Sequence, residues 1–126
     1  MSTYEEMKGY HYKLRIVTVE VDGSPPYKQI TASPGEKRNQ LTANLRETAT
    51  KAFTEQSLFE EPVEGKLCLS ITYRRLVGRC DAANIIGGIA DALQDIAYIN
   101  DSQVREVHYI EEPADREGYT VTVSAP

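Results

Sequence analysis

The sequence has 126 residues, of which 40% are hydrophobic and 26% are charged, and its formal net charge is −5 at pH 7. This composition is typical of one globular domain and excludes a largely disordered chain, and no apolar run is long enough to span a membrane. The negative charge disfavours tight non-specific binding to nucleic acid, although a local basic face is still compatible with it.

The first ten residues mix charges without any period, so we expect a flexible N-terminal arm on a single domain that covers residues 1–126. They lack the basic-then-apolar pattern of a signal peptide, which predicts a soluble, cytoplasmic protein. Cys68 and Cys80 form no CxxC pair and are interpreted as reduced packing thiols rather than as a disulfide or zinc site. His11 and His108 fall on predicted strands and are interpreted as structural.

The first half of the chain predicts a strand followed by a long helix. The run His11–Val21 is β-branched and aromatic, and it ends at turn residues that include Pro25 and Pro26. Ser33 is a good helix cap, and apolar residues then recur at helical spacing to about Leu58.

The second half predicts a strand, a helix and two more strands. Residues 66–73 alternate as a central strand does, and isoleucines at helical spacing mark a second helix after Asp81. Residues 104–110 and 119–123 are interpreted as a hairpin across the loop 112–118. The order β-α-β-α-β-β predicts an α+β domain with two helices packed on one face of a mixed four-stranded sheet.

Three aspartates occur in or beside the second predicted helix, and each has an ordinary structural explanation. Asp81 suits an N-cap that accepts the amide of Asn84, and Asp101 lies in a turn-forming segment. Asp91 lies about 80° from Asp81 around an ideal helix, so it either approaches the same site or faces solvent.

The same aspartates have a functional explanation if the fold brings them together. Two carboxylates suit Mg²⁺, which takes one or two acids together with water and phosphate oxygens. Such an ion polarises a phosphate while nearby arginines contact the nucleic-acid backbone, and the chain has Arg74, Arg75 and Arg79 just upstream.

The spacing of these residues resembles the RusA family of Holliday junction resolvases. That family has a basic run, Asp-x-Asp-Asn-x-x-Lys, Asp-Ala-Leu in the same helix, and then Asp-Asp-x-Gln-Val. Here Asp81 and Asn84 match the first motif, residues 91–93 read Asp-Ala-Leu, and residues 100–104 read Asn-Asp-Ser-Gln-Val with Asp101 as the second acid. The proline turn at Pro25 and Pro26 is also similar to an early turn of the family.

The resemblance implies a RusA-like fold and a homodimeric, Mg²⁺-dependent endonuclease that acts on four-way DNA junctions in recombination and repair, without a membrane or a small-molecule cofactor. It implies catalytic and metal-binding roles for three acids, which are Asp81, Asp91 and Asp101. It implies DNA contacts for a second set of residues, which are Arg74, Arg75, Arg79 and Asn84.

The chain departs from the family's motif at three positions. Ala83 replaces the second acid, Gly87 replaces the lysine, and Asn100 replaces the first acid of the last segment. Alanine cannot bind a metal and glycine cannot reach a phosphate, so we expect weak or absent cleavage, because electrostatic stabilisation is usually the largest catalytic effect. Whether Asn84 or Asn100 takes over a lost role stays open.

Gly87 and Gly88 also raise a packing question, because each glycine inside a helix costs about 1 kcal/mol relative to alanine. A close approach of another backbone would offset that cost, either from the protein's own sheet or from a second helix across a dimer axis. Three functions therefore stay open: a RusA-like nuclease, a catalytically silent relative that binds branched DNA, and a dimeric interaction protein that no longer binds nucleic acid.

Overall fold

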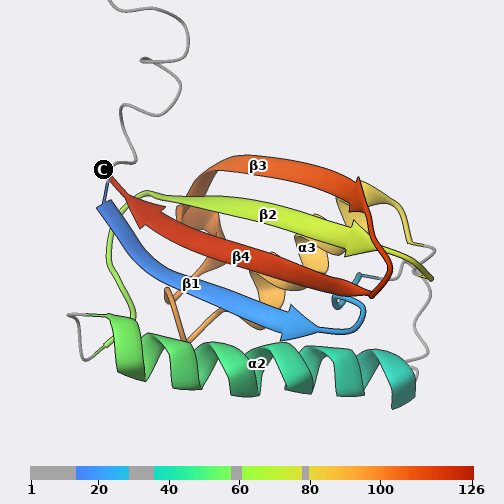
Figure 1. Cartoon of the computed structure of the whole chain (residues 1–126). Coiled ribbons are helices and arrows are strands. Elements are labelled where there is room, and N and C mark those ends of the chain that lie inside the picture. Colours follow the sequence, from blue (N-terminus) through green and yellow to red (C-terminus); the bar gives the residue numbers. More distant parts are fainter. Residues whose placement is uncertain (1–13, 29–35, 58–60, 78–79) are drawn as a thin grey trace, which may run out of the picture.

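The computed structural model describes residues 14–28, 36–57, 61–77 and 80–126, which form a four-stranded sheet, two α-helices and one short 3-10 helix (Figure 1). In chain order the elements are β1 (Leu14–Asp22), α2 (Glu36–Gln56), β2 (Leu67–Arg75), α3 (Ala82–Ala92), η1 (Asp101–Gln103), β3 (Val104–Pro113) and β4 (Gly118–Ala125). The predicted α+β class and the predicted element order are confirmed. The predicted arm, the start of the first predicted strand, the Ser33 cap and Arg79 lie outside the described residues.

The strand order in the sheet is β1-β4-β2-β3, so the predicted hairpin of the last two strands is wrong. Strand β4 inserts between β1 and β2 and is antiparallel to both, whereas β3 pairs with β2 in parallel. The reason is apolar content: Tyr119, Val121 and Val123 of β4 are completely buried, while most residues of β3 are exposed or half-buried. Burial therefore favours β4 at the centre of the sheet and β3 at its edge.

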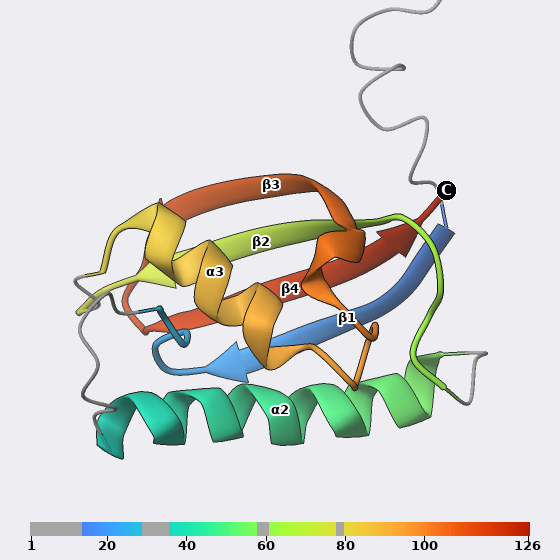
Figure 2. The same cartoon turned by 180° about the vertical axis from the view of Figure 1, so that it is seen from behind.

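Strand β2, helix α3 and strand β3 form a parallel strand pair joined by a crossover helix. Parallel neighbours need a connection of a dozen or more residues, and residues 76–103 supply it. Figure 2 shows α3 running across one face of the sheet, starting beside the end of β2 and leading towards η1 near the start of β3. The C-terminal end of α3 lies beside α2, and the loop after it leads on to η1 at the start of β3 (Figure 2).

The core lies between the sheet and the two helices. Leu69, Ile71 and Tyr73 of β2 point into it, and Ile85 and Ile89 of α3 pack there with less than 2% of their surface exposed. Successive side chains along a strand point to opposite faces of the sheet, so the alternation of residue types in β2 indicates a strand with one face in the core. A bulge between Arg15 and Val17 in β1 departs from strict alternation.

Helix α2 packs along the β1 edge of the sheet and beside α3 (Figure 2). The Gln56 amide of α2 accepts a hydrogen bond from the Thr18 N–H at 2.8 Å and donates one to the Thr18 carbonyl at 2.9 Å. The Gln56 side chain therefore makes the two hydrogen bonds that a neighbouring strand would make. It pairs the N–H and the carbonyl of Thr18, which are otherwise unpaired at the edge of the sheet.

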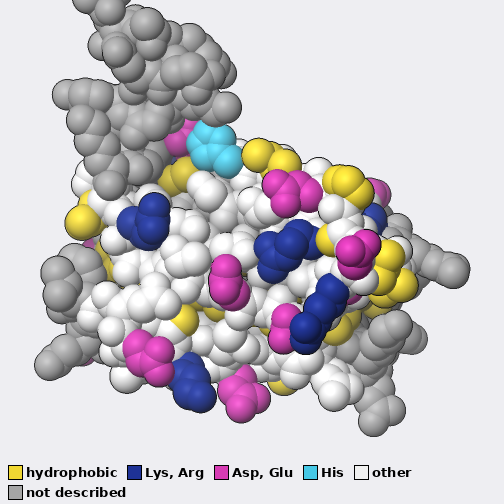
Figure 3. Space-filling model, viewed as in Figure 1, with side chains coloured by type: hydrophobic (Ala, Val, Ile, Leu, Met, Phe, Trp, Pro, Cys, Tyr) yellow, Lys and Arg dark blue, Asp and Glu magenta, His cyan; other side chains and the backbone are white. Residues whose placement is uncertain are grey.

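The other face of the sheet carries mostly polar side chains and is not covered by either helix (Figure 1). Thr18 and Thr122 share a hydrogen bond across β1 and β4, and Figure 3 shows scattered charges on this face with hydrophobic atoms concentrated towards its β3 side. Within the part of the chain that the structure describes, neither helix is long and apolar enough to cross a bilayer.

Candidate functional site

The start of α3 is fixed by Asp81, as the N-cap interpretation predicts. Its backbone is extended and its carboxylate accepts the Asn84 N–H at 3.2 Å, which satisfies one of the free amides at the helix start. The side chain of Asp81 is exposed, so its remaining oxygen atoms are accessible from solvent. The cap and a ligand role are therefore compatible with each other.

The segment that follows β1 packs directly on the glycines of α3. A Cβ atom at Gly88 would lie 2.5 Å from the backbone N and Cα atoms of Tyr27 and 2.6 Å from the carbonyl carbon of Pro26, closer than real Cβ atoms come. The Lys28 N–H also donates to the Asn84 carbonyl at 2.9 Å. The predicted close backbone approach is confirmed at Gly88, and it comes from this loop of the same chain rather than from the sheet.

Gly87 faces a side chain instead of backbone. A Cβ atom there would lie 3.1 Å from Cδ and 3.7 Å from Cε of Lys28. The Lys28 side chain therefore passes over the position where the family's motif has a lysine, and its Nζ lies one bond beyond Cε. Lys28 is exposed, and no ion pair engages it within the described part of the chain.

Glu117 holds together the two segments that lead to the start of α3. Its carboxylate accepts hydrogen bonds from the Ser24 hydroxyl at 2.6 Å, from the Tyr73 hydroxyl, and from the backbone N–H groups of Leu76 and Val77. Ser24 begins the segment that packs on Gly88, and Leu76 and Val77 lead from β2 towards α3. Glu117 is therefore a positioning residue for this end of the molecule.

The hydrogen bonds to Glu117 also control its ionisation. Burial alone would raise the pKa of this carboxyl, but the hydrogen bonds from Ser24, Tyr73 and the two backbone amides outweigh burial and lower its pKa to about 2. A carboxyl whose folded-state pKa lies below its unfolded value stabilises the fold above the unfolded pKa. That stabilisation is lost as the pH falls from about 4.5 towards 2.

We expect Glu117→Gln to lower the free energy of unfolding by roughly 2 kcal/mol at pH 7, because hydrogen bonds to a charged group contribute about 1.5–3 kcal/mol. The variant should also lose part of the acid sensitivity of the unaltered protein between pH 4.5 and 2. Urea unfolding across this pH range measures both effects. Glu112→Gln, at an exposed neighbouring position, is the control, and equal stability of the two variants at pH 7 would contradict the positioning role.

The opposite end of α3 carries Asp91 and Asp101, which Gln94 links. The Gln94 amide donates to the Asp91 carboxylate at 2.9 Å and accepts the Asp101 N–H at 3.2 Å. Arg46 of α2 donates to the carbonyls of Ala92 and Gln94 at 2.7 and 3.0 Å, which is a favourable place for a cation beside a helix C-terminus.

Both carboxylates also act on the buried Tyr98 at this end of α3. Burial first, and then the negative charges of Asp101 and Asp91, raise the pKa of the Tyr98 phenol. That phenol donates to the Ala90 carbonyl at 2.5 Å. Asp91 and Asp101 are therefore both close enough to Tyr98 for their negative charges to affect its pKa.

One chain does not bring the three predicted acids together. Asp81 precedes the first residue of α3 and Asp91 lies in its last turn, a separation of about 15 Å at 1.5 Å per residue. Among the described residues, the three acids form no group whose oxygens could all bind one ion. The described residues of a single chain therefore do not fit a Mg²⁺ site that uses all three acids.

The predicted DNA-binding arginines are divided between the two faces of the sheet. Arg75 makes a two-pronged ion pair with Glu111 of β3, at 2.7 and 2.8 Å, and donates to the Cys80 carbonyl beside Asp81. Arg74, the preceding residue, instead donates to the Thr120 hydroxyl at 3.1 Å on the polar face. Asn84 is half-buried at the start of α3, next to Lys28.

Sequence reasoning missed Lys28, Gln94 and Glu117. Lys28 follows the Pro25-Pro26 turn, but no local pattern indicates that this turn folds back onto the glycine pair. Glu117 lies in an acidic turn where nothing in the sequence distinguishes it from its neighbours. Gln94 follows Asp-Ala-Leu directly, and its link between two acids depends on the path of the chain after α3.

Comparison with known proteins agrees with the spacing of these motifs. The family model described as endodeoxyribonuclease RusA matches residues 26–124, which include the Pro26–Lys28 segment, α3 and all three acids. No curated protein matches the chain in sequence. Because the match covers most of the chain and contains each motif described above, the protein belongs to the RusA endodeoxyribonuclease family.

Proposed function

We propose that the protein is a homodimer that binds branched DNA, such as a four-way junction, holds Mg²⁺ between its two chains, and cleaves DNA weakly or not at all. The observation that carries this proposal is the separation of the acids in a member of a nuclease family. Asp81 lies at one end of α3, whereas Asp91 and Asp101 lie at the other end. If the two-fold axis of the dimer lies roughly perpendicular to α3, the two copies of the helix run antiparallel, and Asp81 of each protomer would then lie beside the partner's Asp101.

Exposed apolar side chains support this dimer. Leu76 and Val77 are 55% and 67% exposed at the Asp81 end, and Ile99 is 58% exposed at the Asp101 end. Val107 and Ile110 of the edge strand β3 are 37% and 58% exposed, on opposite faces of the sheet. Exposed apolar side chains beside the unpaired edge of a strand favour association with a second copy.

The residues near Asp81 support binding more than cleavage. Ala83 is exposed where the family's motif has a second carboxylate, so the site lacks one of its oxygen ligands. Gly87 occupies the position of the family's lysine and has no charge. Lys28 supplies a positive charge instead, because its side chain crosses the same position. The site therefore keeps a cation for a phosphate but has lost part of its acid set.

A binding experiment tests this proposal. We expect a higher affinity for a four-way junction than for linear duplex DNA, with the affinity falling as salt increases. Lys28→Ala should make the salt dependence shallower by about one released counterion, because one phosphate contact is lost. Lys51→Ala, at an exposed position of α2, should leave the salt dependence unchanged.

Two outcomes of this experiment would count against the proposal in different ways. Absence of any affinity at low salt would refute DNA binding itself. Equal slopes for Lys28→Ala and the unaltered protein would refute the role of Lys28 alone.

The charge of the chain favours a second candidate function, that of a dimeric protein-interaction module. The net charge is −5, and Arg75, one of the predicted DNA contacts, is paired with Glu111. The same titration discriminates between the two functions, because a protein-interaction module would bind neither junction nor duplex at low salt.

A further inference from the structure

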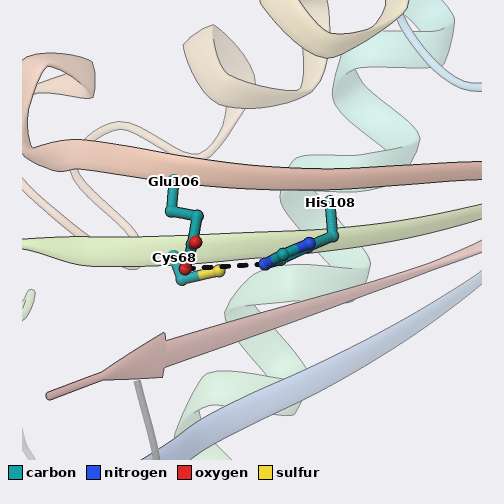
Figure 4. Close-up of side chains that lie close together, drawn as sticks. All are labelled: Cys68, Glu106 and His108. Carbon is teal, nitrogen blue, oxygen red and sulfur yellow. Dashed lines mark ion pairs between the residues drawn. The ribbon is translucent and has the colours of Figure 1, made fainter. Parts of the chain in front are cut away.

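Three side chains of metal-binding type meet on the polar face of the sheet, which α3 does not cover. Cys68 lies on β2, and Glu106 and His108 lie on the neighbouring strand β3 (Figure 4). The Cys68 sulfur, a Glu106 oxygen and a His108 nitrogen all lie within 4.8 Å of one another. The Glu106 carboxylate is 3.5 Å from the His108 Nε2.

The register of the sheet explains why these three residues converge. Cys68 is directly opposite Glu106 in the parallel β2–β3 pair, and His108 is two residues further along β3. Residues two apart on a strand point to the same face. The cluster is therefore built into regular sheet structure, where the backbone holds the three side chains in place.

We infer that Cys68, Glu106 and His108 bind a Zn²⁺ ion or a similar transition metal that fastens the edge strand β3 to β2. Thiolate and imidazole ligands select such borderline-soft metals over Mg²⁺. In a tetrahedral site with Zn–S near 2.3 Å and Zn–N near 2.0 Å, ligand atoms are roughly 3.4–3.6 Å apart. The Glu106 and His108 atoms, 3.5 Å apart, already have this spacing, and separations of up to 4.8 Å to the Cys68 sulfur need to close by about 1 Å, which small side-chain rotations provide.

The surroundings of the cluster fit an ion that enters from solvent. Cys68 is 2% exposed and forms the floor, while the side chains of His108 and Glu106 are 29% and 32% exposed. Burial raises the pKa of the Cys68 thiol and Glu106 raises it further, whereas the hydrogen bond with the Ser70 side chain acts in the opposite direction. An outer-shell partner of this kind orients a ligand and favours its charged form.

The location of the cluster separates it from the proposed DNA site. It lies on the opposite face of the sheet from α3, and it uses neither Asp81 nor Lys28. Strand β3 pairs with β2 alone among the described strands, so a metal that joins these two strands would stabilise the part of the sheet with the least support.

Cobalt binding to tag-free, reduced protein tests this inference, because a thiolate bound to Co²⁺ gives a near-ultraviolet charge-transfer band. We expect one Co²⁺ per chain with this band, displacement by Zn²⁺, and a melting temperature that rises with Zn²⁺. The chain has two cysteines and two histidines, which provides matched controls. Cys68→Ser should abolish the band, and Cys80→Ser and His11→Ala should retain it.

His108→Ala decides the case if Cys68→Ser fails to fold, because the His108 side chain is partly exposed. Loss of a direct ligand should weaken Co²⁺ affinity by more than the roughly 10–100-fold that loss of an outer-shell partner costs. Absence of the band in the unaltered protein would overturn the inference. Unchanged affinity in His108→Ala, or loss of the band in Cys80→Ser, would also overturn it.

Discussion

Replacing Gly88 with alanine is expected to destabilise the protein by roughly 1–3 kcal/mol, which is the typical cost of forcing extra volume into a packed contact. The new methyl group would lie 2.5 Å from backbone atoms of Tyr27. Backbone cannot rotate away as a side chain does, so either the Pro26–Lys28 segment or α3 must move. The gain of about 1 kcal/mol in helix propensity offsets only part of this cost.

Gly87→Ala is the matched control for this prediction, because the two glycines are adjacent in the same helix. Its methyl group meets only the flexible Lys28 side chain, at 3.1 Å, so we expect a change between zero and a gain of about 1 kcal/mol. Urea unfolding of the two variants measures the difference. Equal stability of both variants would show that the Pro26–Lys28 segment is not packed on Gly88.

Replacing Ala83 with aspartate is expected to raise Mg²⁺-dependent junction cleavage by about 100-fold or more, the effect typical of one electrostatic group at a reacting phosphate. The position is exposed and lies in the first turn of α3, where a negative charge is favourable. The substitution therefore adds a carboxylate two residues from Asp81 without a cost in folding.

Ala83→Asn is the control, because it has nearly the same shape without the charge and should give no increase. Adding Gly87→Lys to Ala83→Asp should give little further increase while Lys28 is present, and it should restore activity lost in Lys28→Ala. A folded Ala83→Asp variant that binds the junction with unaltered affinity but cleaves no faster would show that the missing acid does not explain weak cleavage.

Local features of the fold were predictable because local interactions determine them. The Asp81 cap, the apolar spacing of α3 and the alternation of β2 each depend on residues within one or two turns or along one strand, and the structure has all three. The order of the strands depends on which strand buries the most surface. Alternation alone did not distinguish the central β4 from the edge strand β3.

The candidate site was only partly predictable for the same reason. The motif spacing identified the family, as the family match shows, and the roles of the three acids stay a prediction. Their distribution along α3 follows from helix length, because ten residues separate Asp81 from Asp91. Motif spacing does not reveal that the Lys28 side chain lies over Gly87. The two residues are 59 positions apart, and the turn that carries Lys28 has no sequence period from which its path could be predicted.

Manganese binding to mixed dimers tests most directly whether the acids act between two chains. Asp81→Asn and Asp101→Asn proteins, each also carrying His108→Ala to remove the β2–β3 cluster, are prepared separately and then mixed. Mn²⁺ binding is measured by electron paramagnetic resonance. We expect two ions per dimer of the His108→Ala protein, strongly weakened binding in either variant alone, and one ion per mixed dimer, because one of the two shared sites is then intact. Binding that follows a single chain, with no recovery on mixing confirmed heterodimers, would contradict a site shared between two chains.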